Sequence, residues 1–317
     1  SIDTTRLPDT TAVERTFVWA PALAAAGDRI LLAAGNEGLV TLAPPADGAA
    51  GEITEANVIR TIGHPMGVAL SDAVAYVTDA DNELWTLDVR DPSAPVVLGR
   101  AVLTADRPYA LSDPQGGPLV VRDGFAYVAR SPVNFTPGGL HVFDVRDPAR
   151  PAQVGMWDPD VQSGVDPGYT DWGSITGLRP PELAGDRLFL AGYPALTELD
   201  VTDPARPRFV RHGHARYGYA GYMGFDAGGV ATDGRRVYVA AYEGGVYGAD
   251  LSAAGAVSFT AQAEMPGFAM DLALVGGHRL VLREQWIPAR ATQRIAAIDN
   301  LVGDTVAGVA RTPSDQA

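Results

Sequence analysis

The sequence predicts an all-β fold, a six-bladed β-propeller with four-stranded antiparallel blades. Near-identical phrases recur along the chain: LDVRDP at 87–92, FDVRDP at 143–148 and LDVTDP at 199–204. The shared Asp88, Asp144 and Asp200 lie at equal intervals. Short apolar stretches bounded by Gly, Pro and Asp surround them, which is the pattern of β-strands. Strand-rich units at a fixed period of about 40–50 residues are typical of propellers.

Weaker copies extend the series in both directions. Asp250 and Asp299 follow Asp200 at similar spacing, and Leu39–Leu42 precedes Asp88 with the aspartate lost. Six units result, over approximately 19–62, 66–103, 117–158, 175–214, 222–265 and 268–311. The chain is therefore expected to form a single propeller domain over 1–317.

Each unit has the same expected internal order. A turn leads into an apolar strand, as at 73–78, 125–129, 188–191, 237–241 and 280–282. A hairpin, the strand ending in the repeated Asp, and an outer strand such as 96–102 or 209–212 follow. Residues 13–19 and 305–310 look like outer strands that compete for the edge of the last blade. Pairing of N- and C-terminal strands is expected to close the ring and protect its edges.

The pattern apolar–x–apolar–x–Asp–Val–x–Asp–Pro–x–x–Pro resembles the LVIVD-repeat β-propeller family. Units two, three and four match it closely, and the other units keep the strand order, so the resemblance spans roughly 27–312. It implies a structural role for the motif. The first proline of each phrase stops a strand, and the aspartate before that proline, Asp91, Asp147 or Asp203, bonds backbone N–H groups of its turn.

Composition excludes several functional classes. The chain has no Cys, and its 24 basic residues are all Arg. Thiol nucleophiles, cysteine metal sites, disulfides and lysine Schiff bases are therefore impossible. A net charge of −14 disfavours nucleic acid as a partner. No apolar run is long enough for a membrane span. Because the chain begins at Ser1 without a signal peptide, we expect a processed protein of extracellular, periplasmic or cell-surface location, as the resemblance also implies.

Loops that enter the first strand of each blade should converge on one mouth of a central channel. The candidate ligand-binding residues lie in them: Trp19, His64, Arg107, Tyr109, Trp172, Phe225, Asp226, Phe268 and Asp271. Met66, Met223 and Met270 lie in the same loops. The alternative is that these apolar side chains only plug the channel and pack blades together.

Two long segments, 158–177 and 211–229, add to this mouth. His212 and His214 could hold a metal with Asp226, or the tyrosines beside them could stack on a sugar or aromatic ligand. The stretch 79–83, DADNE, resembles the opening of a calcium loop. It lacks the glycine and terminal glutamate of an EF-hand, so turn chemistry is the favoured interpretation.

The favoured function is an exported or surface-associated binding module for a small molecule or for a protein or saccharide surface. The alternative is a hydrolase, lyase or isomerase acting on a small organic molecule, with His64, Arg107, Asp171, Asp226 and Asp271 as its catalytic groups. No nucleophile elbow or other catalytic motif is present. The sequence requires no cofactor. Lactonase-type propellers hold calcium with Glu, Asn and Asp, and these loops offer only Asp.

Overall fold

A computed structural model describes the chain as an all-β protein with one short 3-10 helix, Gly35–Glu37. The described residues are 22–26, 29–43, 54–60, 62–104, 116–130, 139–158, 180–192, 195–214, 229–241, 245–252, 255, 257–259, 261–263, 268–275, 279–285, 293–298, 301–302, 305–306 and 309–310. The chain divides into two compact units, 1–126 with 143–153, and 127–142 with 154–317.

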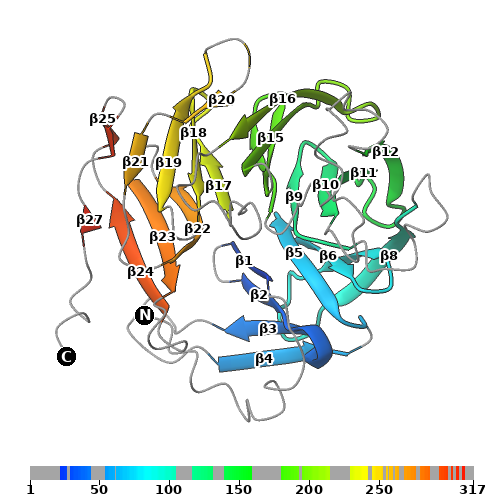
Figure 1. The fold of residues 1–317 in the computed structure, drawn as a ribbon. Coiled ribbons are helices and arrows are strands. Elements are labelled where there is room, and N and C mark those ends of the chain that lie inside the picture. The colour runs from blue at the N-terminus through cyan, green and yellow to red at the C-terminus, as the bar shows by residue number, and fades with distance from the viewer. Residues whose placement is uncertain are drawn as a thin grey trace. The chain divides into compact units, whose positions relative to one another are not determined.

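The first unit contains two complete four-stranded antiparallel sheets. The first is β1 (Ala22–Ala26), β2 (Arg29–Ala33), β3 (Leu39–Ala43) and β4 (Thr54–Ile59), hydrogen-bonded in that order (Figure 1). The second is β5 (Pro65–Ser71), β6 (Val74–Asp79), β7 (Glu83–Asp88) and β8 (Val96–Val102). Each strand pairs with the next along the chain, which is the meander expected from short connections.

The third sheet has the same consecutive order. Its strands are β9 (Leu119–Arg122), β10 (Phe125–Arg130), β11 (Gly139–Asp144) and β12 (Ala152–Trp157). The boundary between the two units passes through this sheet.

The second unit contains three further sheets. The fourth sheet is β13 (Glu182–Ala184), β14 (Arg187–Gly192), β15 (Ala195–Asp200) and β16 (Arg208–His214), extended in parallel by β20 (Val257–Ser258). The fifth is β17 (Gly229–Thr232), β18 (Arg236–Ala240), β19 (Val246–Asp250) and β21 (Ala261–Ala263). The sixth is β22 (Phe268–Val275), β23 (Arg279–Gln285), β24 (Gln293–Ile298) and β27 (Val309–Ala310). A hairpin of β25 (Leu301–Val302) and β26 (Thr305–Val306) precedes β27.

The apolar strands predicted from the sequence are confirmed as β6, β10, β14, β18 and β23, and the predicted outer strands as β8 and β16. The predicted strand at 305–310 is instead two short strands. Only its last part, β27, pairs with β24, because residues 305–306 are used in the hairpin with β25. Residues 13–19 lie outside the described residues, so closure by an N-terminal strand stays a prediction.

The repeated aspartate ends the third strand of its sheet and makes the local bonds that its motif predicts. Its Oδ1 accepts the backbone N–H two residues later, at 2.9 Å for Asp88, 3.1 Å for Asp144 and 2.9 Å for Asp200. Asp250 forms the same bond at 2.7 Å. Hydrogen bonds from Thr202 hold the pKa of Asp200 below its ordinary value, and those from Arg146 do so for Asp144. The structural role of these aspartates is confirmed.

The aspartate that precedes each proline shapes the turn itself. Oδ1 of Asp91, Asp147 and Asp203 each accepts the backbone N–H two residues later. Each backbone carbonyl also accepts the N–H three residues later. The motif is therefore a pair of consecutive side-chain-capped turns.

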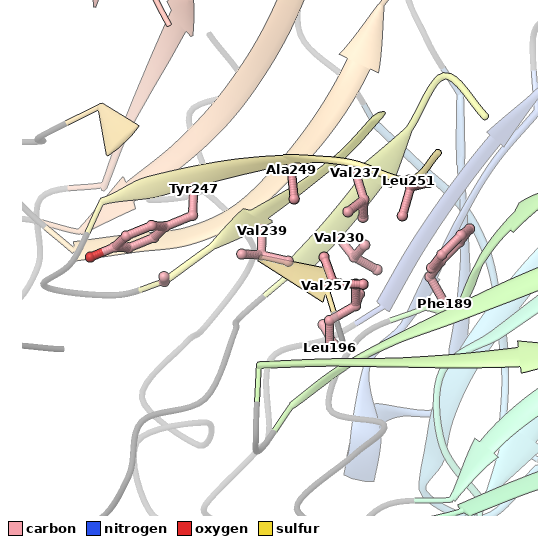
Figure 2. Packing of buried hydrophobic residues seen from close by; sticks show 11 residues of the cluster. Phe189, Leu196, Val230, Val237, Val239, Tyr247, Ala249, Leu251 and Val257 are labelled. Atoms are coloured by element: carbon pink, nitrogen blue, oxygen red, sulfur yellow. The ribbon is translucent and has the colours of Figure 1, made fainter. Parts of the chain in front are cut away.

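The apolar residue after the repeated aspartate carries this turn into the core. Val89 is buried with Leu31 and Leu39 of the preceding sheet. Leu251 occupies the same place in the second unit, with Phe189 and Leu196 (Figure 2). Burial of such side chains contributes roughly 1.5–3 kcal/mol each. The repeat thus stacks the second sheet on the first and the fifth sheet on the fourth.

Candidate functional site

The described part of the predicted mouth begins at the start of β5. His64 is exposed and has a positive φ of 44°. Its backbone carbonyl accepts the N–H of Ala80 at 3.1 Å, which ties this entrance to the β6–β7 hairpin. A Cβ on neighbouring Gly63 would lie 3.2 Å from Oδ2 of Asp81. His64 therefore lies beside an acidic hairpin at the entrance of its sheet.

The entrance loops predicted around Met66 and Met270 are mostly strand, and this corrects the sequence analysis. Pro65–Gly67 belongs to β5, and Phe268–Asp271 belongs to β22. Each strand is interrupted by a β-bulge, between Pro65 and Gly67 and between Ala269 and Asp271. A bulge adds one residue while keeping the strand paired, which explains why these stretches do not read as regular strand. The added residues are Met66 and Met270.

Asp271 is the first residue after the bulge in β22. It is half-buried, and its Oδ1 accepts the N–H of Leu272 at 2.9 Å. Gly229, the first residue of β17, lies so close that a Cβ there would overlap Oδ1 of Asp271. In β5 the residue after the bulge, equivalent to Asp271, is Gly67. A Cβ on Gly67 would overlap the carbonyl oxygen of Gly117, which lies just before β9. In each unit, therefore, the start of one first strand approaches the neighbouring first strand closely. Of β5 and β22, only β22 has a carboxylate at this point of approach.

Glu182, on the first strand of the fourth sheet, was not among the predicted residues. It pairs across the sheet with buried Phe189. Burial raises the pKa of Glu182 to about 7, although a hydrogen bond with the Thr232 backbone acts in the opposite direction. The corresponding residue of β5 is Ala69, which pairs with Tyr76. The signal available in the sequence was a glutamate directly after Pro180 and Pro181, where β5 has Ala69 and β17 has Ala231.

Glu182 and Asp271 lie on either side of β17. Glu182 contacts the last residue of that strand, Thr232, and Asp271 contacts the first, Gly229. Two residues lie between these neighbours, which are therefore about 10 Å apart along the strand at the usual rise. The two carboxylates therefore favour separate polar contacts with a ligand over a close acid–base pair.

The hairpin at 79–83 is confirmed as a turn. Oδ1 of buried Asp79 accepts the N–H groups of Asp81 at 3.1 Å and Glu83 at 2.8 Å. Its Oδ2 accepts the indole N–H of Trp85 at 2.7 Å. Burial raises the pKa of Asp79. Both of its oxygens are therefore used within the hairpin.

His212 lies on β16, which continues to His214, so the first residues of the predicted 211–229 loop are strand. Its Nδ1 is 3.2 Å from the hydroxyl of Thr197, and its ring lies 4.5 Å from that of Phe209. Among the residues that the structure describes, no group of three His, Asp or Glu side chains is arranged to hold a metal. The His214 side chain and Asp226 lie outside those residues.

The other predicted site residues also lie outside the described residues. These are Trp19, Arg107, Tyr109, Asp171, Trp172, Phe225 and Asp226, together with the side chain of Phe268. His64 and Asp271 belong to different units. Clustering of the full predicted set stays a prediction.

No helix in the described parts of the chain has the length and apolar character needed to cross a bilayer.

Comparison with known proteins gives a family match and a fold. The LVIVD repeat family model matches residues 62–102. No curated protein matches the chain significantly. A periplasmic gluconolactonase of Pseudomonas aeruginosa, PpgL, is similar in structure with a TM-score of 0.61 and 17% identity, over 88% of this chain and 81% of that one.

Two other solved structures are similar over most of their length. The β-propeller domain of Cps50 (Swd1) from Myceliophteria thermophila has a TM-score of 0.53 and 14% identity, over 83% of this chain and 79% of that one. BamB from Moraxella catarrhalis has a TM-score of 0.50 and 15% identity, over 83% and 68%. At these identities the likeness shows the fold alone. The chain therefore has a β-propeller fold, and its residues 62–102 are an LVIVD repeat.

Proposed function

We propose that this chain is a single, closed, six-bladed propeller that binds a polar ligand at the mouth entered by the first strands. The single observation that carries the proposal is the position of Asp271. The repeat aspartates lie in turns after third strands, whereas Asp271 follows a bulge at the start of a first strand, accepts the N–H of Leu272 and lies against Gly229 of the preceding first strand, β17. Bulges next to functional sites redirect side chains in this way.

The ligand class follows from the groups that flank β17. A carboxylate at Asp271 and a partly buried carboxyl at Glu182 suit separate hydroxyl or amine groups of a ligand. An oligosaccharide, an amino sugar or the surface of a glycoprotein fits this description. His64, Arg107, Tyr109, Trp172 and Asp226 complete the proposed site, with the aromatic rings covering apolar faces of the ligand.

Export is part of this proposal. The periplasmic gluconolactonase is a neighbour in fold, and a chain without cysteine is compatible with an oxidising compartment. The resemblance to LVIVD-repeat propellers supports the same location.

Titration calorimetry with a panel of neutral and amino-sugar oligosaccharides tests the binding function. Asp271→Asn should weaken binding about tenfold, because one charge-assisted hydrogen bond is lost. Asp250→Asn is the matched control, since Oδ1 of Asp250 accepts the N–H of Ser252 in its own turn and its nearest cation is Arg235 at 3.9 Å. Equal affinities for the two variants, or ligand bound at the outer turns, would overturn the proposed site.

A second candidate function is an enzyme acting on a small organic molecule such as a lactone. It is favoured by Glu182, whose pKa of about 7 suits a general acid or base at neutral pH. The likeness to a gluconolactonase points in the same direction. Acid release from aldonolactones, followed with a pH indicator, should then be lost in Glu182→Gln while binding persists.

A further inference from the structure

The outer edge of the second sheet is long and apolar. β8 is the last strand of the order β5-β6-β7-β8, and no described strand pairs with its outer side. Three of its side chains are among the exposed large apolar residues of the described chain: Val96 at 58%, Val97 at 43% and Val102 at 57%. An unpaired edge strand offers backbone N–H and C=O groups to another strand, and proteins usually blunt such edges with charge or proline.

One face of β8 carries most of this apolar surface. A β-bulge at Leu98 shifts the alternation, so Val97, Arg100 and Val102, which pair with Leu87, Trp85 and Glu83, share a face. Arg100 bonds Glu83 at 3.1 Å and lies over the Trp85 ring at 5.5 Å, so its charge is directed back onto the sheet. Val97 and Val102 on the same face stay exposed.

The equivalent edge of the fourth sheet already accepts an added strand. β20 pairs in parallel with β16, Gly213 with Val257 and His214 with Ser258. Val257 is buried there, with Leu196 and Val230 (Figure 2). β8 and β16 are the fourth strands of their sheets, and each faces a third strand across a bulge. The fourth strand of this repeat is therefore shaped to receive a further strand.

We propose that β8 is a docking site for an extended segment of a partner protein, which adds to the sheet as β20 adds to β16. Backbone hydrogen bonds would hold the segment, and the apolar residues on one of its faces would cover Val97 and Val102. Charge defines its flanks: residues 65–102 contain six acidic and two basic side chains, a net charge of −4. The partner segment is apolar in the middle and basic at its ends. A second copy of this chain, itself at −14, is disfavoured by repulsion.

Displayed linear peptides of about ten residues, selected on the immobilised full chain, test this proposal. Enriched peptides should alternate β-branched residues and carry Arg or Lys at their ends. A synthetic copy of one should bind the Val97→Arg/Val102→Arg variant at least about tenfold more weakly. The matched control is Val154→Arg/Val210→Arg, two exposed valines on other fourth strands, and it should bind normally. Unchanged melting temperatures for both variants establish that they fold.

N-methylation of the peptide backbone separates strand addition from ordinary apolar contact. Two peptides are compared, one methylated at the odd-numbered and one at the even-numbered backbone nitrogens. Binding should be abolished in one and kept in the other, because a strand directs alternate N–H groups to its neighbour. Selection that yields no binder, or a peptide whose affinity is insensitive to both the valine variant and N-methylation, would overturn the proposal. So would sedimentation of the free chain as a dimer that the valine variant dissociates, since the occupant would then be a second copy.

Discussion

The second and fourth sheets share one turn motif but solve the junction to the following sheet with different chemistry. In the second sheet, buried Thr86 donates its hydroxyl to the carbonyl of Pro148, in the turn that follows β11. Its cross-strand partner is Gly99. A Cβ on Gly99 would lie 2.6 Å from the carbonyl oxygen of Ala149, so only glycine fits against that turn. This junction is neutral and made of small groups.

In the fourth sheet the same two positions hold an ion pair. Glu198 replaces the threonine and Arg211 replaces the glycine, and the two residues pair across the strands. Oε2 of Glu198 accepts from Nε of Arg211 at 2.7 Å, and Oε1 accepts from Nε of Arg187 at 2.6 Å. Arg211 then donates to the carbonyls of Leu251 at 2.8 Å and Gly255 at 3.2 Å, after the next repeated aspartate.

The comparison shows that the repeat keeps a hydrogen bond from one sheet to the turn of the following sheet, although the residue that donates it differs. In both sheets a group from the third or fourth strand bonds a carbonyl in the turn that follows the next third strand. A threonine spans a short distance and an arginine a longer one. The first sheet follows the neutral solution, since Thr41 donates to the carbonyl of Pro92 at 2.7 Å.

Of the substitutions that test this comparison, removal of Glu198 should lower the free energy of unfolding most. Only 3% of its side chain and 12% of that of Arg211 are exposed, so Glu198→Ala leaves a buried, uncompensated arginine. We expect a loss of roughly 3–5 kcal/mol in the free energy of unfolding, measured by denaturant titration. The double variant Glu198→Thr/Arg211→Gly, which copies the second sheet, should recover part of the loss. A double variant as unstable as the single one would contradict the equivalence of the two junctions.

Substitution of the glycine at the junction should cause the second-largest loss of stability. Gly155 on β12 lies 56 positions after Gly99, and a Cβ there would overlap the carbonyl oxygen of Pro204. Gly155→Ala must displace that turn, at a cost of roughly 1–3 kcal/mol. Val154→Ala, an exposed neighbour, should change stability by less than about 0.5 kcal/mol. Equal effects would show that the turn moves freely.

The repeated aspartate should stabilise the second and fourth sheets to a similar extent, because its bonds are local to its own turn. Asp200→Ala should cost roughly 1–2 kcal/mol by leaving the N–H of Thr202 without its acceptor. The pKa of Asp200 is lowered in the folded protein, so its contribution is present above the unfolded pKa near 3.9 and lost as pH falls below it. Thermal unfolding of Asp88→Ala and Asp200→Ala at neutral pH should agree closely. Loss of ligand binding with unchanged melting temperature would contradict the structural role.

Sequence reasoning succeeded where the repeat dictates backbone geometry. The phrase Asp-Val-x-Asp-Pro encodes its own turns through side chains one to three residues away, so Asp88 and Asp144 could be assigned correctly. It did not find Glu198 with Arg211 or the added strand β20, because these depend on residues brought together from separate strands. The bulges at Met66 and Met270 were also missed, since an extra residue in a strand reads locally as the end of a loop.

The smallest expected effect on stability comes from a difference between the first strands of the second and fourth sheets. Glu182 occupies the place of Ala69, and burial raises its pKa to about 7. A carboxyl whose folded pKa is raised stabilises the protein fully below its unfolded pKa, near 4.3, and loses that contribution as pH rises toward 7. Unfolding free energy should therefore fall by roughly 1 kcal/mol over this range, less than the full shift implies because the side chain is partly accessible to solvent. Glu182→Gln should remove that dependence. A wild-type profile that is flat between pH 4.5 and 7, or one that Glu182→Gln leaves unchanged, would show that the carboxyl is solvated and that the two first strands differ in sequence alone.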